Sequence, residues 1–161
     1  MSTEIIEIND DKVNKLASLI HEVWKIGIQQ EYMNVGLSPR TERMRPSKMG
    51  DGLQVNINVP YNELNKPWQD EQKKAAELAL NTVCKYPDNP ELAFDYIHNE
   101  WLNRNSWARG DKNYDAPFRQ LSINEKEKDI LHYLLAKKII EGVHINISDI
   151  LHEAQRMSYI F

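Results

Sequence analysis

Residues 19–24 read LIHEVW and residues 96–101 read YIHNEW, so the pattern Ile-His-x-x-Trp occurs twice in the chain. Each copy is followed by a loop, by the motif Pro-aromatic-x-x-Leu and by a highly charged helical segment, in the same order. The matching positions are His21 and His98, Trp24 and Trp101, Pro60 and Pro117, Tyr61 and Phe118, and Leu64 and Leu121. Such internal similarity predicts one structural unit that is present twice.

The shared residues of each unit have a simple physical explanation. Ile and Trp four residues apart lie on one face of a helix, and the histidine lies beside the isoleucine. Proline fixes the backbone φ angle, so the chain turns there, and the aromatic residue and leucine that follow can insert between two helices. One helix pair is too small to bury a large core, whereas two pairs packed together can do so.

We therefore predict a mainly α fold in which two pseudo-symmetric helix-pair repeats pack together, with a few short β-strands. The chain is expected to form a single compact domain over residues 1–161. Its parts are the repeats at about 10–85 and 88–142 and a C-terminal strand and helix at 143–161. Apolar periodicity and capping residues predict helices at about 10–30, 65–84, 90–104 and 122–141, with a short last helix after Ser148.

Alternation of apolar and polar residues predicts two strands. The segments are LQVNINV at 53–59 and VHINI at 143–147, and we expect them to pair with each other. Residues 36–52 contain three glycines, two prolines and four basic residues without a helical period. This segment is predicted to be a long basic loop.

Composition excludes several classes of protein. The chain of 161 residues carries a net charge of −4 and one cysteine. The negative charge argues against binding to a nucleic-acid polymer, because such proteins need cationic residues to neutralise phosphates. One cysteine excludes an intramolecular disulfide and a cysteine-based zinc site. No apolar run reaches the ~18 residues that span a bilayer, and the acidic N-terminal segment lacks an apolar signal core. We expect a soluble cytoplasmic protein that does not enter a membrane.

The repeated residues resemble the ryanodine-receptor repeat (RyR) domain family. The resemblance rests on the Ile-His-x-x-Trp pattern, an aromatic turn that ends in glycine, a Val-Pro-Tyr-x-x-Leu motif and a Glu/Lys-rich helix, and it covers about 16–80 and 92–135. The turn reads WARG at 107–110 and, one residue longer, YMNVG at 32–36. The charged helix ends in Asp129 in the second copy and has no matching aspartate in the first.

This resemblance implies a mainly α-helical fold with small β elements, and two divergent copies in tandem. Besides animal calcium-release channels, the family occurs in bacterial and phage proteins. There the domain is thought to be a non-catalytic recognition module, and its ligands are thought to be nucleotide-derived molecules such as ADP-ribose species.

Two loops contain the residues expected to bind such a ligand. A flat aromatic side chain beside guanidinium groups is suited to stacking on a base and pairing with a phosphate. The candidate residues are Trp107, Arg109 and Arg104 in the second copy and Tyr32, Arg40 and Arg43 in the first. The alternatives are that Trp107 folds back into the core and that the first loop is merely a solvated basic segment.

His21 and His98 are further candidates, either as ligand contacts or as acid–base groups. The alternative is that each is a helix histidine that hydrogen-bonds across its repeat. No nucleophile motif, carboxylate motif or glycine-rich phosphate loop accompanies them, so we expect no catalytic residue and no enzyme activity. The last helix lacks the H-E-x-x-H pattern, so we expect no metal site and no cofactor.

Three functions remain open at this point. The first is a non-enzymatic protein that binds a small anionic, nucleotide-derived ligand of the ADP-ribose or cyclic-nucleotide type, as a sensor or by sequestering it. The second is a protein–protein interaction module without a small ligand. The third is a nucleotide-acting hydrolase that uses a histidine base. The apolar residues of the fourth helix also make a homodimer possible.

Overall fold

The computed structural model describes residues 8–34 and 42–161, with the backbone alone for residues 28–34. This part of the chain is mainly helical, and the mainly α fold is confirmed. The helices are α1 (Asp10–Asn34), α2 (Lys66–Lys85), α3 (Pro90–Arg104), α4 (Ile123–Glu141) and α5 (Ile147–Ile160). The strands are β1 (Met44–Pro46) and β2 (Gln54–Asn56), and the 3-10 turns are η1 (Tyr61–Glu63), η2 (Ser106–Ala108) and η3 (Phe118–Gln120).

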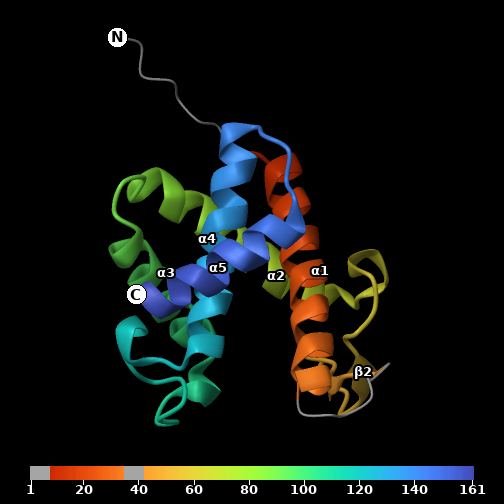
Figure 1. Ribbon diagram of the computed structural model, residues 1–161. Coiled ribbons are helices and arrows are strands. Elements are labelled where there is room, and N and C mark those ends of the chain that lie inside the picture. The colour runs from red at the N-terminus through yellow and green to blue at the C-terminus, as the bar shows by residue number, and fades with distance from the viewer. Residues whose placement is uncertain (1–7, 35–41) are drawn as a thin grey trace.

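The helices surround one cluster of buried apolar side chains. α1 packs along α2, and α4 packs against α1, α2 and α5, so α4 lies in the middle of the bundle (Figure 1). Every helix contributes to the cluster, for example through Leu16, Leu80, Phe94, Ile130 and Met157. The short sheet lies beside the C-terminal half of α1, away from α3 (Figure 1).

Side-chain caps explain where several helices begin and end. Asn89 accepts a hydrogen bond from the backbone N–H of Leu92, and Ser122 accepts one from that of Glu125, so both satisfy an unpaired donor of a first helical turn. Gly142 ends α4 in the left-handed conformation, with φ of 68°. Asn146, rather than the predicted Ser148, caps α5 by accepting from the backbone N–H of Asp149.

The prediction that 53–59 pairs with 143–147 is wrong. β2 pairs instead with β1 in an antiparallel hairpin, with Arg45 opposite Val55. The connection between the strands reverses because Lys48, Gly50 and Gly52 all have positive φ. Part of the predicted basic loop is therefore a strand.

Residues 143–146 form no strand, although they alternate in sequence. Gly142 terminates α4 and Asn146 caps α5, so only a short connection separates the two helices. The apolar residues of this connection, such as Ile145, pack against the core instead. Capping by one asparagine thus overrides a weak strand pattern.

The two proline motifs adopt the same local conformation. Pro60 has φ of −54° and ψ of 148°, and Pro117 has φ of −56° and ψ of 147°. Each proline opens a single 3-10 turn that is followed by a buried leucine, Leu64 or Leu121. The next helix begins two residues later in both copies. These turns match as the sequence predicts, but α1 lies along α2 more extensively than α3 lies along α4, so overall pseudo-symmetry stays a prediction.

The apolar residues of α4 that made a homodimer possible are used within the chain. Ile130, Leu135 and Ile139 are buried, and α5 lies across the helix (Figure 1). Leu131 and Leu134 pack against the same core cluster. The apolar surface of α4 therefore gives no support to a dimer. Of the described helices, none is both long and apolar enough to cross a membrane.

Candidate functional site

His21 lies at the edge of the core on α1. Ile20 and Val23 beside it are buried, and His21 itself is only 1% exposed. Its Nε2 atom lies 2.7 Å from the backbone oxygen of Val59. A carbonyl oxygen only accepts hydrogen bonds, so Nε2 must carry the proton. This contact holds the ring against the segment that precedes Pro60.

The other ring nitrogen of His21 is unused. Nδ1 is buried and has no hydrogen-bond partner among the described residues. Burial, the largest influence, lowers the pKa of His21, and the contact with the Val59 carbonyl offsets this only in part. His21 is therefore neutral at pH 7, and Nδ1 presents a lone pair. Buried polar atoms without a partner are rare and call for an explanation.

A hollow of about 180 Å³ lies beside this histidine. It is formed by α1, by the hairpin and the segment after it, and by the first turns of α2. The lining residues are His21, Trp24, Arg43, Arg45, Ile57, Leu64, Trp68 and Gln72. Two indoles, two guanidinium groups and one histidine thus surround one small space in the first copy.

The hairpin that carries Arg45 is fixed to α2 through its backbone. The indole N–H of Trp68 donates to the carbonyl of Pro46 at 2.9 Å, and the side-chain amide of Asn65 donates to that of Ser47 at 2.9 Å. The ammonium group of Lys48 lies 4.2 Å from the centre of the Trp68 ring, a cation–π contact. These three contacts position the strand that forms one wall of the hollow.

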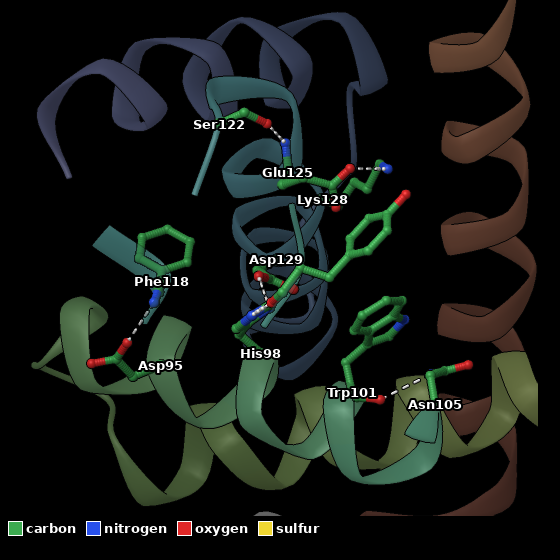
Figure 2. Close-up of polar contacts among 10 residues, drawn as sticks. Asp95, His98, Trp101, Asn105, Phe118, Ser122, Glu125, Lys128 and Asp129 are labelled. Atoms are coloured by element: carbon green, nitrogen blue, oxygen red, sulfur yellow. Dashed lines mark hydrogen bonds and ion pairs between the residues drawn. The ribbon is translucent and has the colours of Figure 1, made fainter. Parts of the chain in front are cut away.

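His98, the counterpart of His21, lies in a different environment. Its Nε2 atom is 2.8 Å from the carbonyl oxygen of Tyr114, and its Nδ1 atom is 3.4 Å from the carboxylate of Asp129 (Figure 2). Both ring nitrogens therefore face acceptors. His98 is 3% exposed and Asp129 is 7% exposed, so the pair is buried. One proton must lie between Nδ1 and the carboxylate.

Burial and the partner act in opposite directions on this pair. Burial lowers the pKa of His98, but the hydrogen bond and charge of Asp129 outweigh it, so the pKa is raised overall. Burial raises the pKa of Asp129, and His98 offsets this only in part. Both directions favour the state in which the pair holds a proton.

Trp107 does not fold back into the core, since it is 66% exposed. Its ring meets Trp101 edge-on at 5.8 Å and Tyr114 at 5.6 Å between centroids, and its indole N–H donates to Asn105. Trp107 is therefore the outer member of an aromatic cluster that extends inward to Trp101. Trp101 in turn stacks on His98.

The arginines of the second copy are engaged by neighbouring side chains. Arg104 forms an ion pair with Glu71 at 3.4 Å. Arg109 donates to the amide oxygen of Asn103 at 2.8 Å and lies 3.5 Å from Asp115. The predicted arrangement of an aromatic ring and arginines is present here, with acidic or amide partners already in place.

The structure thus separates the predicted site residues into two groups. His21 and Arg43 line the hollow, whereas the other described candidates surround the aromatic cluster: His98, Arg104, Trp107 and Arg109. Figure 1 shows the hairpin and the segment after α3 on opposite sides of the bundle. Arg40 and the side chain of Tyr32 lie outside the described residues.

Sequence reasoning missed three residues of the hollow. Trp24, which the sequence marks only as part of the Ile-His-x-x-Trp helix face, is half-buried and lines the hollow, as do Trp68 and Gln72. A signal was present in the sequence, because a tryptophan at 68 interrupts the otherwise charged first turns of this helix.

The described residues were also compared with the arrangements that bind metal ions and with known proteins. Among residues 8–34 and 42–161, no group of three or more His, Cys, Asp or Glu side chains is placed to hold a metal ion. Comparison of the chain with models of known protein families, with curated proteins and with solved structures returns no match. The resemblance to the ryanodine-receptor repeat therefore stays a prediction from the residues quoted above.

Proposed function

We propose that this protein binds a small anionic, nucleotide-derived ligand without turning it over, and that the hollow beside His21 holds one end of that ligand. The observation that supports the proposal is the composition of the hollow. Arg43 and Arg45 can pair with a phosphate, and the indoles of Trp24 and Trp68, which also line the hollow, offer aromatic surface to a base or sugar. The resemblance to the ryanodine-receptor repeat points to the same class of ligand.

The size of the hollow limits how much of the ligand enters. Pockets for whole small molecules usually measure about 300–1,000 Å³, and this one measures about 180 Å³. One phosphate-sized group with its neighbouring sugar or base fits such a volume. The rest of the ligand then lies across the exposed hairpin, outside the hollow.

In the second copy, an anion would meet acidic side chains beside the arginines. Arg104 and Arg109 are already paired with Glu71 and Asp115, and an incoming phosphate must compete with these carboxylates. His98 also lacks a ring nitrogen that is free to accept a proton, since both face acceptors. This arrangement argues against a histidine base at this position and favours binding over hydrolysis.

A thermal-shift panel tests the proposal. ADP-ribose, a cyclic dinucleotide and a cyclic mononucleotide are the probes, with uncharged adenosine and ribose as controls. A ligand at 100 times its Kd stabilises the folded state by about 2.7 kcal/mol, so the Tm rises by several degrees. We expect a shift with at least one anionic probe and none with the uncharged controls.

Two matched double variants locate the site. Arg43→Gln with Arg45→Gln removes two positive charges from the first copy, and Arg104→Gln with Arg109→Gln removes two from the second. We expect the first pair to abolish the shift and the second to preserve it. The reverse result places the ligand at Trp107. No shift with any probe overturns the proposal in favour of a protein partner, and release of a reaction product overturns the non-catalytic assignment.

A further inference from the structure

The two copies carry a different residue at one matching position of their second helix. Both α2 and α4 begin two residues after the buried leucine of the proline motif, and the seventh residue of each helix is Gln72 and Asp129, respectively. Asp129 contacts Nδ1 of His98, and Gln72 lines the hollow beside His21. The position that holds a carboxylate in the second copy thus holds a neutral amide in the first.

The contacts on the opposite side of the two imidazoles are equivalent. Nε2 of His21 and Nε2 of His98 each lie within hydrogen-bond distance of a backbone carbonyl, at 2.7 Å and 2.8 Å. Trp24 and Trp101 stack on the two histidines, with interplanar angles of 20° and 15°. The clearest difference between the two rings is at Nδ1, which meets a carboxylate in His98 and has no hydrogen-bond partner among the described residues in His21, a residue that lines the hollow.

From this comparison we infer that an acidic group of the ligand occupies, against Nδ1 of His21, the place that the carboxylate of Asp129 occupies against Nδ1 of His98, and that its binding puts a proton on His21. The inference rests on the proposed function and specifies the chemistry of its site. Nε2 already donates to Val59, so Nδ1 can donate to an anion only after the ring becomes an imidazolium. The proton comes from solvent, and the ligand's negative charge stabilises it.

The charges around His21 fit this coupling. The titratable or charged groups that face it come from α1, the hairpin and the first 3-10 turn, and they are Glu22, Lys25, Arg43, Arg45 and Tyr61. The helix α2 presents Trp68 and Gln72, which do not titrate. Glu22 and Lys25 pair with each other at 3.6 Å, and their charges act on the pKa of His21 in opposite directions. Burial is the largest influence against a cationic His21 in the free protein, and the negative charge of an anionic ligand at Nδ1 would favour the imidazolium.

Isothermal titration calorimetry measures the coupled proton directly. ADP-ribose is a suitable probe because its pyrophosphate does not titrate near neutrality, so any proton taken up belongs to the protein. Binding is measured at pH 7 in buffers of different ionisation enthalpy. We expect an uptake that approaches about one proton per ligand, and an affinity that rises as the pH falls, by up to about tenfold per pH unit.

Matched histidine variants assign that proton. The substitution His21→Gln keeps a donor for the Val59 carbonyl and removes the titrating ring, so the uptake should vanish. The substitution His152→Gln at an exposed position of α5 is the control and should leave the uptake unchanged. Binding without proton uptake overturns the inference and leaves the proposed function standing. Absence of binding by ADP-ribose and every other probe overturns both.

A substitution at position 72 tests the same point without a ligand. Gln72→Asp supplies the carboxylate from the chain itself, and Gln72→Asn is its uncharged counterpart of equal size. NMR titration of the His21 ring should show a raised pKa in Gln72→Asp and the ordinary lowered pKa in Gln72→Asn. Gln72→Asp should also block ADP-ribose, because its carboxylate fills the anion's place. An unchanged His21 titration in Gln72→Asp overturns the inference.

Discussion

The two histidine sites of this protein begin from the same pattern and differ in what meets one nitrogen atom. Nδ1 of His98 contacts the buried carboxylate of Asp129, whereas His21 lines a hollow together with Gln72 and two arginines. The comparison separates two uses of one local structure. In the second copy the histidine completes a buried polar pair, and in the first copy the same geometry leaves an acceptor unused.

The largest expected effect on stability comes from breaking the buried pair of His98 and Asp129. Removing one partner of a buried ion pair costs about 3–5 kcal/mol, because the other partner is left without compensation. We expect Asp129→Ala to lower the free energy of unfolding by about this amount, as measured by urea denaturation. Gln72→Ala at the matching position should cost less than about 1 kcal/mol. Equal losses from both substitutions contradict the distinction between the two sites.

The second prediction uses pH, because the two histidines act in opposite directions. His98 has a raised pKa, so its contribution is present below the ordinary histidine value near 6.5 and is lost as the pH rises through the folded-state pKa. His21 has a lowered pKa, so its contribution is present above that value and is lost as the pH falls. Each unit of pKa shift corresponds to about 1.4 kcal/mol.

Urea denaturation between pH 5 and pH 9 measures these slopes. His21→Gln should remove loss of stability on the acid side, and Asp129→Asn should reduce the loss on the alkaline side while keeping the shape of the side chain. His144→Gln, at an exposed position, is the control. If both variants change stability on the same side, acid or alkaline, the pKa values of the two histidines are not shifted in opposite directions.

A smaller effect is expected where the two second helices begin. Ser122 caps α4 through the N–H of Glu125, whereas Asn65 makes no such bond and donates instead to Ser47 in the hairpin. Ser122→Ala should cost about 1 kcal/mol of stability and leave ligand binding unchanged. Asn65→Ala should weaken binding at the hollow through the hairpin, and thermal shifts with and without ADP-ribose separate the two effects. Equal binding by both variants shows that Asn65 does not support the site.

The smallest expected effect is at Trp107. Its ring is mostly exposed, so we expect its two edge-on aromatic contacts to contribute at the low end of the range of about 0.5–1.5 kcal/mol per pair. Trp107→Ala should therefore fold, as followed by circular dichroism, and should show the same thermal shifts with the anionic probes as the unchanged protein. Loss of binding in a folded Trp107→Ala protein moves the ligand to the second copy.

Local signals in the sequence predicted much of this fold. Asn89 and Pro90 at the start of α3, the Ser122 cap and Gly142 at the end of α4 act within a few residues, so the helix bounds followed from them. The partner of β2 did not follow, because strand pairing depends on which segment lies nearby in space. The residues at 143–146 alternate like a strand, yet the Asn146 cap commits them to the start of a helix.

The candidate site was predictable only in part for the same reason. His21 and Arg43 were identified by residue type, but their common hollow depends on a hairpin that local patterns did not show. Gln72 attracted no attention because an amide on a charged helix is unremarkable by itself. Its meaning comes from the missing aspartate at the position that matches Asp129, a difference that the repeat makes visible.

The way the hairpin is held bears on how this protein could diverge. Trp68 and Asn65 donate hydrogen bonds to the backbone carbonyls of Pro46 and Ser47. These bonds do not depend on which side chains the hairpin residues carry. Selection is then free to exchange the side chains that project from the strand while the strand stays where it is. Point substitutions in the hairpin could therefore change which ligand this protein prefers while the helical bundle keeps its structure.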